Sequence, residues 1–112
     1  MHEMALCESL IAIIEEQAAS GGFRQVHSIS LEVGALAGVE TEALLFGFRA
    51  ISQGTIAQDA ELKILAATAQ AHCLLCGFEE TVSRPVSLCP ACGGGLHMTG
   101  DRALRIKEME VE

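Results

Sequence analysis

The chain has 112 residues, and half of them are hydrophobic, which suffices for one compact domain or for a domain carrying a small insert. Aromatic residues make up only 4%, without Trp or Tyr, so the core is expected to be aliphatic. Fifteen acidic residues against seven basic ones give a formal charge of −8. This balance argues against binding to nucleic-acid phosphates, which needs clustered Lys and Arg, and it suits metal cations or a basic protein partner.

The N-terminus carries no basic region ahead of an apolar run, so we expect no signal peptide. The apolar run over 10–14 is too short to span a bilayer. Five cysteines, one of which lies outside any pair, fit a reducing compartment. We therefore expect a cytoplasmic protein without a membrane partner.

The first half of the chain predicts two helices and two strands. Apolar side chains at helical spacing predict a helix over 3–19, which Gly21-Gly22 ends. Cys7 lies in this apolar stripe and is expected in the core. A second helix is expected over 40–53, with Thr41 as its N-cap.

Alternation of apolar and polar residues predicts a half-buried strand over 26–34 and a second strand over 60–65. His27 falls on the first strand and is expected to be packed or hydrogen-bonded. The connection between the two strands is long enough for a helical crossover.

Two Cys-x-x-Cys pairs dominate the second half of the chain: Cys73, Cys76, Cys89 and Cys92. A two-residue gap lets both thiolates of a pair face one ion, and glycines after each pair suit the tight bends. Four sulfurs match the tetrahedral demand of structural Zn²⁺. Iron held as in rubredoxin, two disulfides or four inert thiols remain as alternatives.

Four apolar residues between the pairs suggest a short hairpin over the metal: Phe78, Val82, Val86 and Leu88. A third strand is expected over 104–111, with a change of phase near Lys107-Glu108. A lone C-terminal strand has no stability of its own, so it must join the sheet of the first half. The expected fold class is therefore α+β: a small three-stranded mixed sheet with two helices, plus an inserted four-cysteine zinc-binding module. The expected domains are 1–66 with 102–112, and 67–101.

A second metal site is conceivable at the first three residues. The Met1 amine, the amide nitrogen of His2 and its Nδ1 atom form two fused chelate rings, and Glu3 offers a fourth ligand. Such nitrogen-rich, flat ligand sets suit Ni(II) or Cu(II). From the residues alone this signal is weak, and an exposed and unused His2 is the favoured interpretation. His72 and His97 flank the cysteines and are expected outside the zinc shell, with substitution for a thiolate or pH sensing as the alternative.

The residues together resemble a known family. The opening Met-His-Glu-x-x-Leu-Cys, the segments SISLEVG and GVETEALLFGF, the two cysteine pairs and the ending LRIKEMEVE are similar to the HypA/HybF nickel metallochaperones of nickel–iron hydrogenase maturation. The resemblance runs over the whole chain. It implies nickel at His2, with the Met1 amine and Glu3 contributing, and zinc at the four cysteines. The family variant with a histidine directly after each pair is absent, because Gly77 and Gly93 stand there.

The resemblance also implies partners: a GTPase accessory protein and the hydrogenase large subunit, and in some bacteria urease. We expect no enzymatic activity, because four thiolates leave zinc no open position. The alternatives are a zinc-ribbon module for protein interaction and a rubredoxin-like iron electron carrier. A monomer or a weak homodimer is expected, because an inserted module allows strand exchange.

Overall fold

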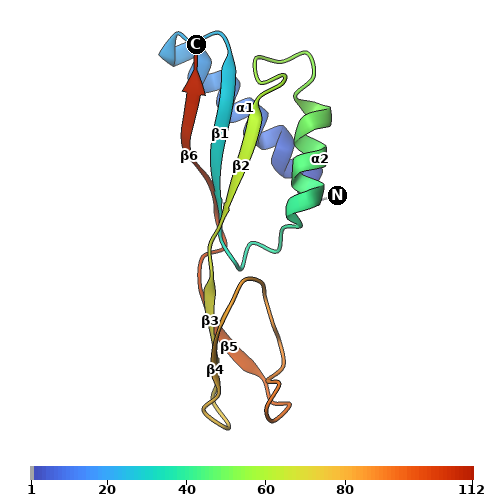
Figure 1. Cartoon of the computed structure of the whole chain (residues 1–112), viewed down its shortest axis with the longest axis vertical. Coiled ribbons are helices and arrows are strands. Elements are labelled where there is room, and N and C mark those ends of the chain that lie inside the picture. The colour runs from blue at the N-terminus through green and yellow to red at the C-terminus, as the bar shows by residue number, and fades with distance from the viewer. Residues whose placement is uncertain (1) are drawn as a thin grey trace. The chain divides into compact units, whose positions relative to one another are not determined.

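The computed structural model describes residues 2–112 (Figure 1). The described elements are, in chain order, α1 (His2–Gly21), β1 (Val26–Val33), α2 (Thr41–Ile51), β2 (Glu61–Ala66), β3 (Ala69–Cys73), β4 (Glu79–Val82), β5 (Leu96–Thr99) and β6 (Leu104–Val111). The strands form two sheets, with the orders β2-β1-β6 and β4-β3-β5. Compact packing divides the chain into two units. The first comprises the chain up to Leu31 with Val39–Ile64 and Ile106–Glu112, and the second comprises Glu32–Gly38 and Leu65–Arg105.

The sheet β2-β1-β6 is mixed, as the sequence predicts. Strands β1 and β2 run in the same direction and are joined through α2, whereas β6 runs in the opposite direction (Figure 1). At its edge the Glu112 N–H donates to the Gln25 carbonyl at 2.9 Å, and the Val26 N–H donates to the Ile56 carbonyl at 2.9 Å. The C-terminal strand therefore returns to the first half of the chain, and the helical crossover is confirmed.

An aliphatic core fills the first unit. Its buried members come from α1, β1, α2 and the loop before β2: Cys7, Leu10, Ile11, Ile14, Val26, Ile29, Leu31, Leu44, Phe48 and Ala57. The helices α1 and α2 pack against each other. Gly47 lies at this contact, where a Cβ atom would be 2.9 Å from the Met4 sulfur and 3.3 Å from the Cys7 sulfur. The helical periodicity read from residues 3–19 therefore describes the buried face of α1.

Two expectations for this unit are wrong in detail. Strand β1 is not half-buried, since Ser28 and Ser30 are each only 8% exposed. β1 is the central strand, so its small hydroxyl side chains have a neighbouring strand on either side. Thr41 is not the N-cap of α2. Glu40 takes that place in an extended conformation, and its side chain makes no capping hydrogen bond.

The second unit contains a three-stranded antiparallel sheet around β3. In β3, buried Ala69, Ala71 and Cys73 alternate with Gln70 and His72 on the other face. β4 pairs with β3, so the first cysteine pair forms the turn of this hairpin. The expected hairpin built from residues between the two pairs is therefore wrong. This pairing was not predicted from the sequence because β3 is a short and only weakly apolar segment.

Neither of the two described helices is long and apolar enough to cross a membrane.

Within the second unit, backbone hydrogen bonds join two segments that are distant in the sequence. The Gly34 N–H donates to the Ala103 carbonyl at 2.9 Å, and the Leu36 N–H donates to the Asp101 carbonyl at 2.9 Å. These bonds hold the segment before β6 against the segment after β1.

Candidate metal centre

The four predicted cysteines come together at one place in the second unit. Their sulfur atoms all lie within 4.8 Å of one another. The Cys73 and Cys92 sulfurs are 3.6 Å apart, and the Cys76 and Cys89 sulfurs are 3.7 Å apart. Four sulfurs bound tetrahedrally at about 2.3 Å from one ion are about 3.8 Å apart. A disulfide would need a sulfur separation of about 2.05 Å. The four sulfurs are therefore clustered as a tetrahedral metal ion requires, and the two-disulfide prediction is wrong.

Two turns of the same design present these sulfurs. In the first, the Cys73 N–H donates to the Phe78 carbonyl at 2.8 Å; in the second, the Cys89 N–H donates to the Gly94 carbonyl at 2.7 Å. Backbone N–H groups also point at the sulfurs. The Gly94 N–H lies 3.4 Å from the Cys92 sulfur. Such donors stabilise thiolate over thiol, which is the form that binds a metal.

The pKa values of the clustered thiols indicate that a cation is needed for all four to ionise. The Cys76 N–H holds the pKa of the Cys73 thiol down at about 6. At Cys76, the Phe78 N–H lowers the pKa, but burial and the neighbouring sulfurs outweigh it and raise the pKa to about 12. Four negative charges at this separation repel one another, so all four thiols ionise together only around a positive ion.

The remaining titratable candidates lie outside this cluster. Cys7 is fully buried in the first unit, and its thiol points to the Leu44 carbonyl at 3.4 Å. It is therefore a core residue, as predicted. The His27 Nε2 atom lies 2.8 Å from a Glu112 carboxylate oxygen, so this histidine is hydrogen-bonded.

The structure describes only part of the predicted N-terminal site. Met1 and the side chain of His2 lie outside the described residues. The Glu3 carboxylate is described, and it accepts a long hydrogen bond of 3.4 Å from the Glu40 N–H. The sequence did not reveal this contact between α1 and the start of α2, because 37 residues separate the two partners.

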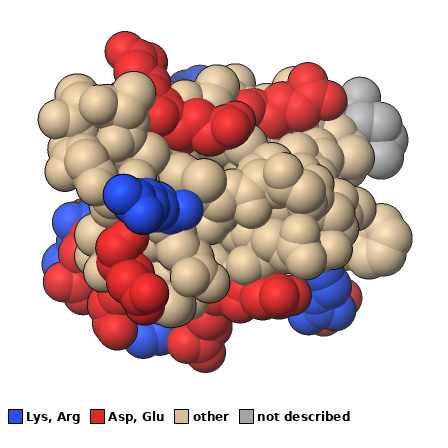
Figure 2. Space-filling model, turned by 90° about the horizontal axis from the view of Figure 1, so that it is seen from above, with Lys and Arg blue, Asp and Glu red and all other residues tan. Residues whose placement is uncertain are grey.

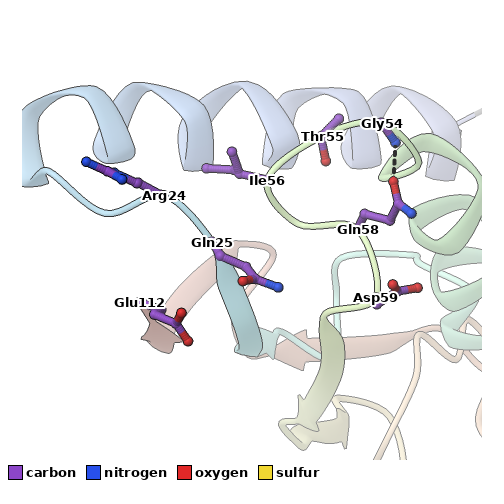
Figure 3. Close-up of a pocket in the computed structure, with 8 residues that line it drawn as sticks. All are labelled: Arg24, Gln25, Gly54, Thr55, Ile56, Gln58, Asp59 and Glu112. Atoms are coloured by element: carbon purple, nitrogen blue, oxygen red, sulfur yellow. Dashed lines mark hydrogen bonds between the residues drawn. The ribbon is translucent and has the colours of Figure 1, made fainter.

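A polar pocket in the first unit contains none of the predicted site residues (Figure 3). It is lined by Arg24, Gln25, Gly54, Thr55, Ile56, Gln58, Asp59 and Glu112. A hydrogen bond of 2.8 Å from the Gly54 N–H to the Gln58 side chain braces its wall. The described residues that line it form no group of three metal-ligand side chains, and we assign the pocket no function.

The fold and this site define a small α+β protein with a four-cysteine metal centre. The family model described as "Hydrogenase/urease nickel incorporation, metallochaperone, hypA" matches residues 1–111. The chain belongs to this HypA family.

Curated relatives support the assignment. The chain is 47% identical to the hydrogenase maturation factor HypA of Acidithiobacillus ferrooxidans and 45% identical to that of Alkalilimnicola ehrlichii, each over the full length of both chains. Among solved structures, the Ni metallochaperone HypA from Helicobacter pylori matches with a TM-score of 0.65 at 18% identity, covering 97% of this chain and 96% of that one. This structural match shows a shared fold.

Proposed function

We propose that the chain is a non-enzymatic nickel metallochaperone, which binds Ni(II) at its N-terminus and delivers it for hydrogenase maturation. The observation that carries this proposal is the family match over 1–111, which includes both His2-Glu3 and the four cysteines. In this proposal the first unit binds nickel, and a zinc ion stabilises the fold of the second unit. Delivery to urease is a further outcome to be tested.

Zinc is the proposed ion at Cys73, Cys76, Cys89 and Cys92. The sulfur separations of 3.6 and 3.7 Å support a tetrahedral ion, and a full set of four thiolates is typical of structural zinc. Such an ion has no open position for a substrate, which supports the non-enzymatic reading. Iron would accept the same geometry, so elemental analysis of the purified protein must distinguish the two.

The start of α1 supports nickel binding by backbone nitrogen. Helix α1 begins at His2. The first four N–H groups of a helix have no carbonyl partner within that helix. The amide nitrogen of His2 is therefore free to lose its proton and bind a metal without breaking a helical hydrogen bond. Together with the Met1 amine and the His2 imidazole, it gives the nitrogen-rich set that suits Ni(II).

The Glu3 carboxylate offsets the electrostatic cost of binding a cation at the start of α1. A helix N-terminus carries partial positive charge, which disfavours a cation. Glu3 lies in the first turn of α1. Its carboxylate bonds weakly to the Glu40 N–H, which leaves the second oxygen available to nickel. The protein as a whole is acidic, and Figure 2 shows acidic side chains gathered along the edges of one face.

The proposed partners follow from the family. They are the GTPase accessory protein and the hydrogenase large subunit, met in the cytoplasm by a monomer or weak homodimer. An N-terminal site of few nitrogens allows a partner to take nickel by replacing the ligands one at a time. The acidic surface supports protein partners over nucleic acid.

The test is nickel titration of untagged protein, wild type against His2→Ala, with zinc content measured in parallel. We expect the substitution to remove the N-terminal nickel site and to leave one zinc per chain. His27→Ala is the matched control, because His27 is a histidine of the same unit that is bonded to Glu112 at 2.8 Å. Equal nickel affinity of wild type and His2→Ala would refute the N-terminal site.

A further inference from the structure

The sheet β4-β3-β5 carries a row of three metal-ligand side chains that the cysteine cluster does not use. His72 of β3 lies directly opposite His97 of β5 and directly opposite Glu79 of β4. Residues directly opposite each other on antiparallel strands share one face of the sheet. The row therefore lies across the face opposite to the one that buries Cys73.

Side chains on this face reach one another across the strands. In the adjacent row, the Gln70 amide donates to the Thr81 hydroxyl at 2.9 Å. Opposed Cβ atoms are about 4.5–5.5 Å apart. Two imidazole nitrogens bound to one ion at about 2.0–2.1 Å must approach to about 3 Å. Two imidazoles at directly opposed positions are therefore spaced so that side-chain rotation can bring both to one ion.

Glu79 lies next to the ring of His72. A Glu79 carboxylate oxygen lies 3.3 Å from the His72 Nδ1 atom. This nitrogen is shielded from solvent and makes no hydrogen bond with good geometry. A carboxylate at this place favours a proton on Nδ1, which leaves the lone pair of Nε2 free. A histidine that binds a metal through one nitrogen almost always donates its other N–H to such a group.

We propose that His72 and His97 bind a divalent transition cation between them, with Glu79 as the positioning carboxylate. Two imidazoles plus water suit Ni²⁺, Cu²⁺ or Zn²⁺. Both histidines are accessible, since the His72 side chain is 42% exposed and His97 is an exposed residue. The site is separate from the cysteine cluster and from the N-terminus, and it does not rest on nickel being the cargo of the protein.

The experiment is titration of Ni²⁺ into zinc-loaded His2→Ala protein, which removes the proposed N-terminal site. We expect one bound Ni²⁺ per chain, and we expect His97→Ala in this background to weaken binding at least tenfold. Ni²⁺ is also expected to broaden the NMR signals of the His72 and His97 rings selectively. His97 is the preferred variant because it is exposed, and zinc content with circular dichroism verifies the fold.

Two matched controls separate this site from scattered surface binding. Glu79→Gln should weaken Ni²⁺ binding by about tenfold, the lower end of what loss of such a partner costs, whereas Glu80→Gln should not, because Glu80 lies opposite Ala71 on the other face. His27→Ala should also have no effect, since His27 has a carboxylate partner but no opposed histidine. Absence of binding in the His2→Ala protein, or binding that His97→Ala leaves unchanged, would overturn the proposal.

Discussion

Gly77 and Gly93 occupy the same place in two copies of one turn, with φ angles of 78° and 77°. Each donates its N–H to the carbonyl of the first cysteine of its pair, at 3.0 Å to Cys73 and at 2.8 Å to Cys89. A left-handed residue at this point folds the chain back so that both sulfurs of a pair face one ion. The metal centre therefore depends on backbone conformation as well as on thiols.

Replacing Gly93 with Ala should destabilise the second unit by about 1–2 kcal/mol, the cost of a left-handed conformation for a residue with a Cβ atom. A Cβ atom at Gly93 meets nothing within 4 Å, so the effect comes from the backbone alone. Metal loss to a competing chelator, measured against wild type, should become faster. Gly95→Ala is the control, because Gly95 also has open space but no positive φ. Equal effects at both positions would contradict this explanation.

Gly34→Ala should be destabilising through a clash. A Cβ atom there would lie 2.2 Å from the backbone carbonyl oxygen of Asp101. The segment must move, which strains the hydrogen bond of 2.9 Å from the Gly34 N–H to Ala103. We expect a loss of about 1–3 kcal/mol, the usual cost of overpacking, in chemical unfolding. Gly21→Ala should be far milder, because its Cβ atom would meet only the Phe23 side chain at 3.4 Å.

Cys7 should be unreactive in the folded protein. Burial raises the pKa of its thiol, and the nearby Glu3 and Glu8 carboxylates raise it further. A raised pKa means less thiolate at a given pH, so alkylation at pH 8 is expected to spare Cys7. After chelation of the metal, mass spectrometry should show four alkylated cysteines, with Cys7 modified only in denaturant. Fast labelling of Cys7 in native protein would show that this helix face is open.

Metal affinity at the four cysteines should fall steeply with falling pH. In the free cluster the pKa of Cys76 is raised to about 12, and that of Cys92 is also raised, so both are protonated at pH 7. Binding must displace at least these two protons. Each displaced proton costs about a factor of ten in affinity per pH unit, so the loss is at least about a hundredfold per unit. Calorimetry in buffers of different ionisation enthalpy measures the number of protons released, and fewer than two would contradict the prediction.

Local patterns in the sequence were sufficient for most elements and for the sulfur ligands. Helical periodicity identified the buried face of α1, and the two-residue spacing identified the cysteine turns, because both signals arise between residues close together in the chain. The hairpin of β3 and β4 was misplaced. Its pairing puts Ala69 opposite Val82, and nothing in these short segments marks that register.

The sequence by itself determined the metal-binding cysteines, the aliphatic core and the return of the last strand to the first sheet. These follow from ligand spacing, from hydrophobic periodicity and from the instability of a lone strand. Only the tertiary structure decided that Ser28 and Ser30 are buried, that Glu3 meets Glu40, and that His72 lies between His97 and Glu79. Such relations depend on strand order and register, which are set by packing between distant segments and leave no local periodicity.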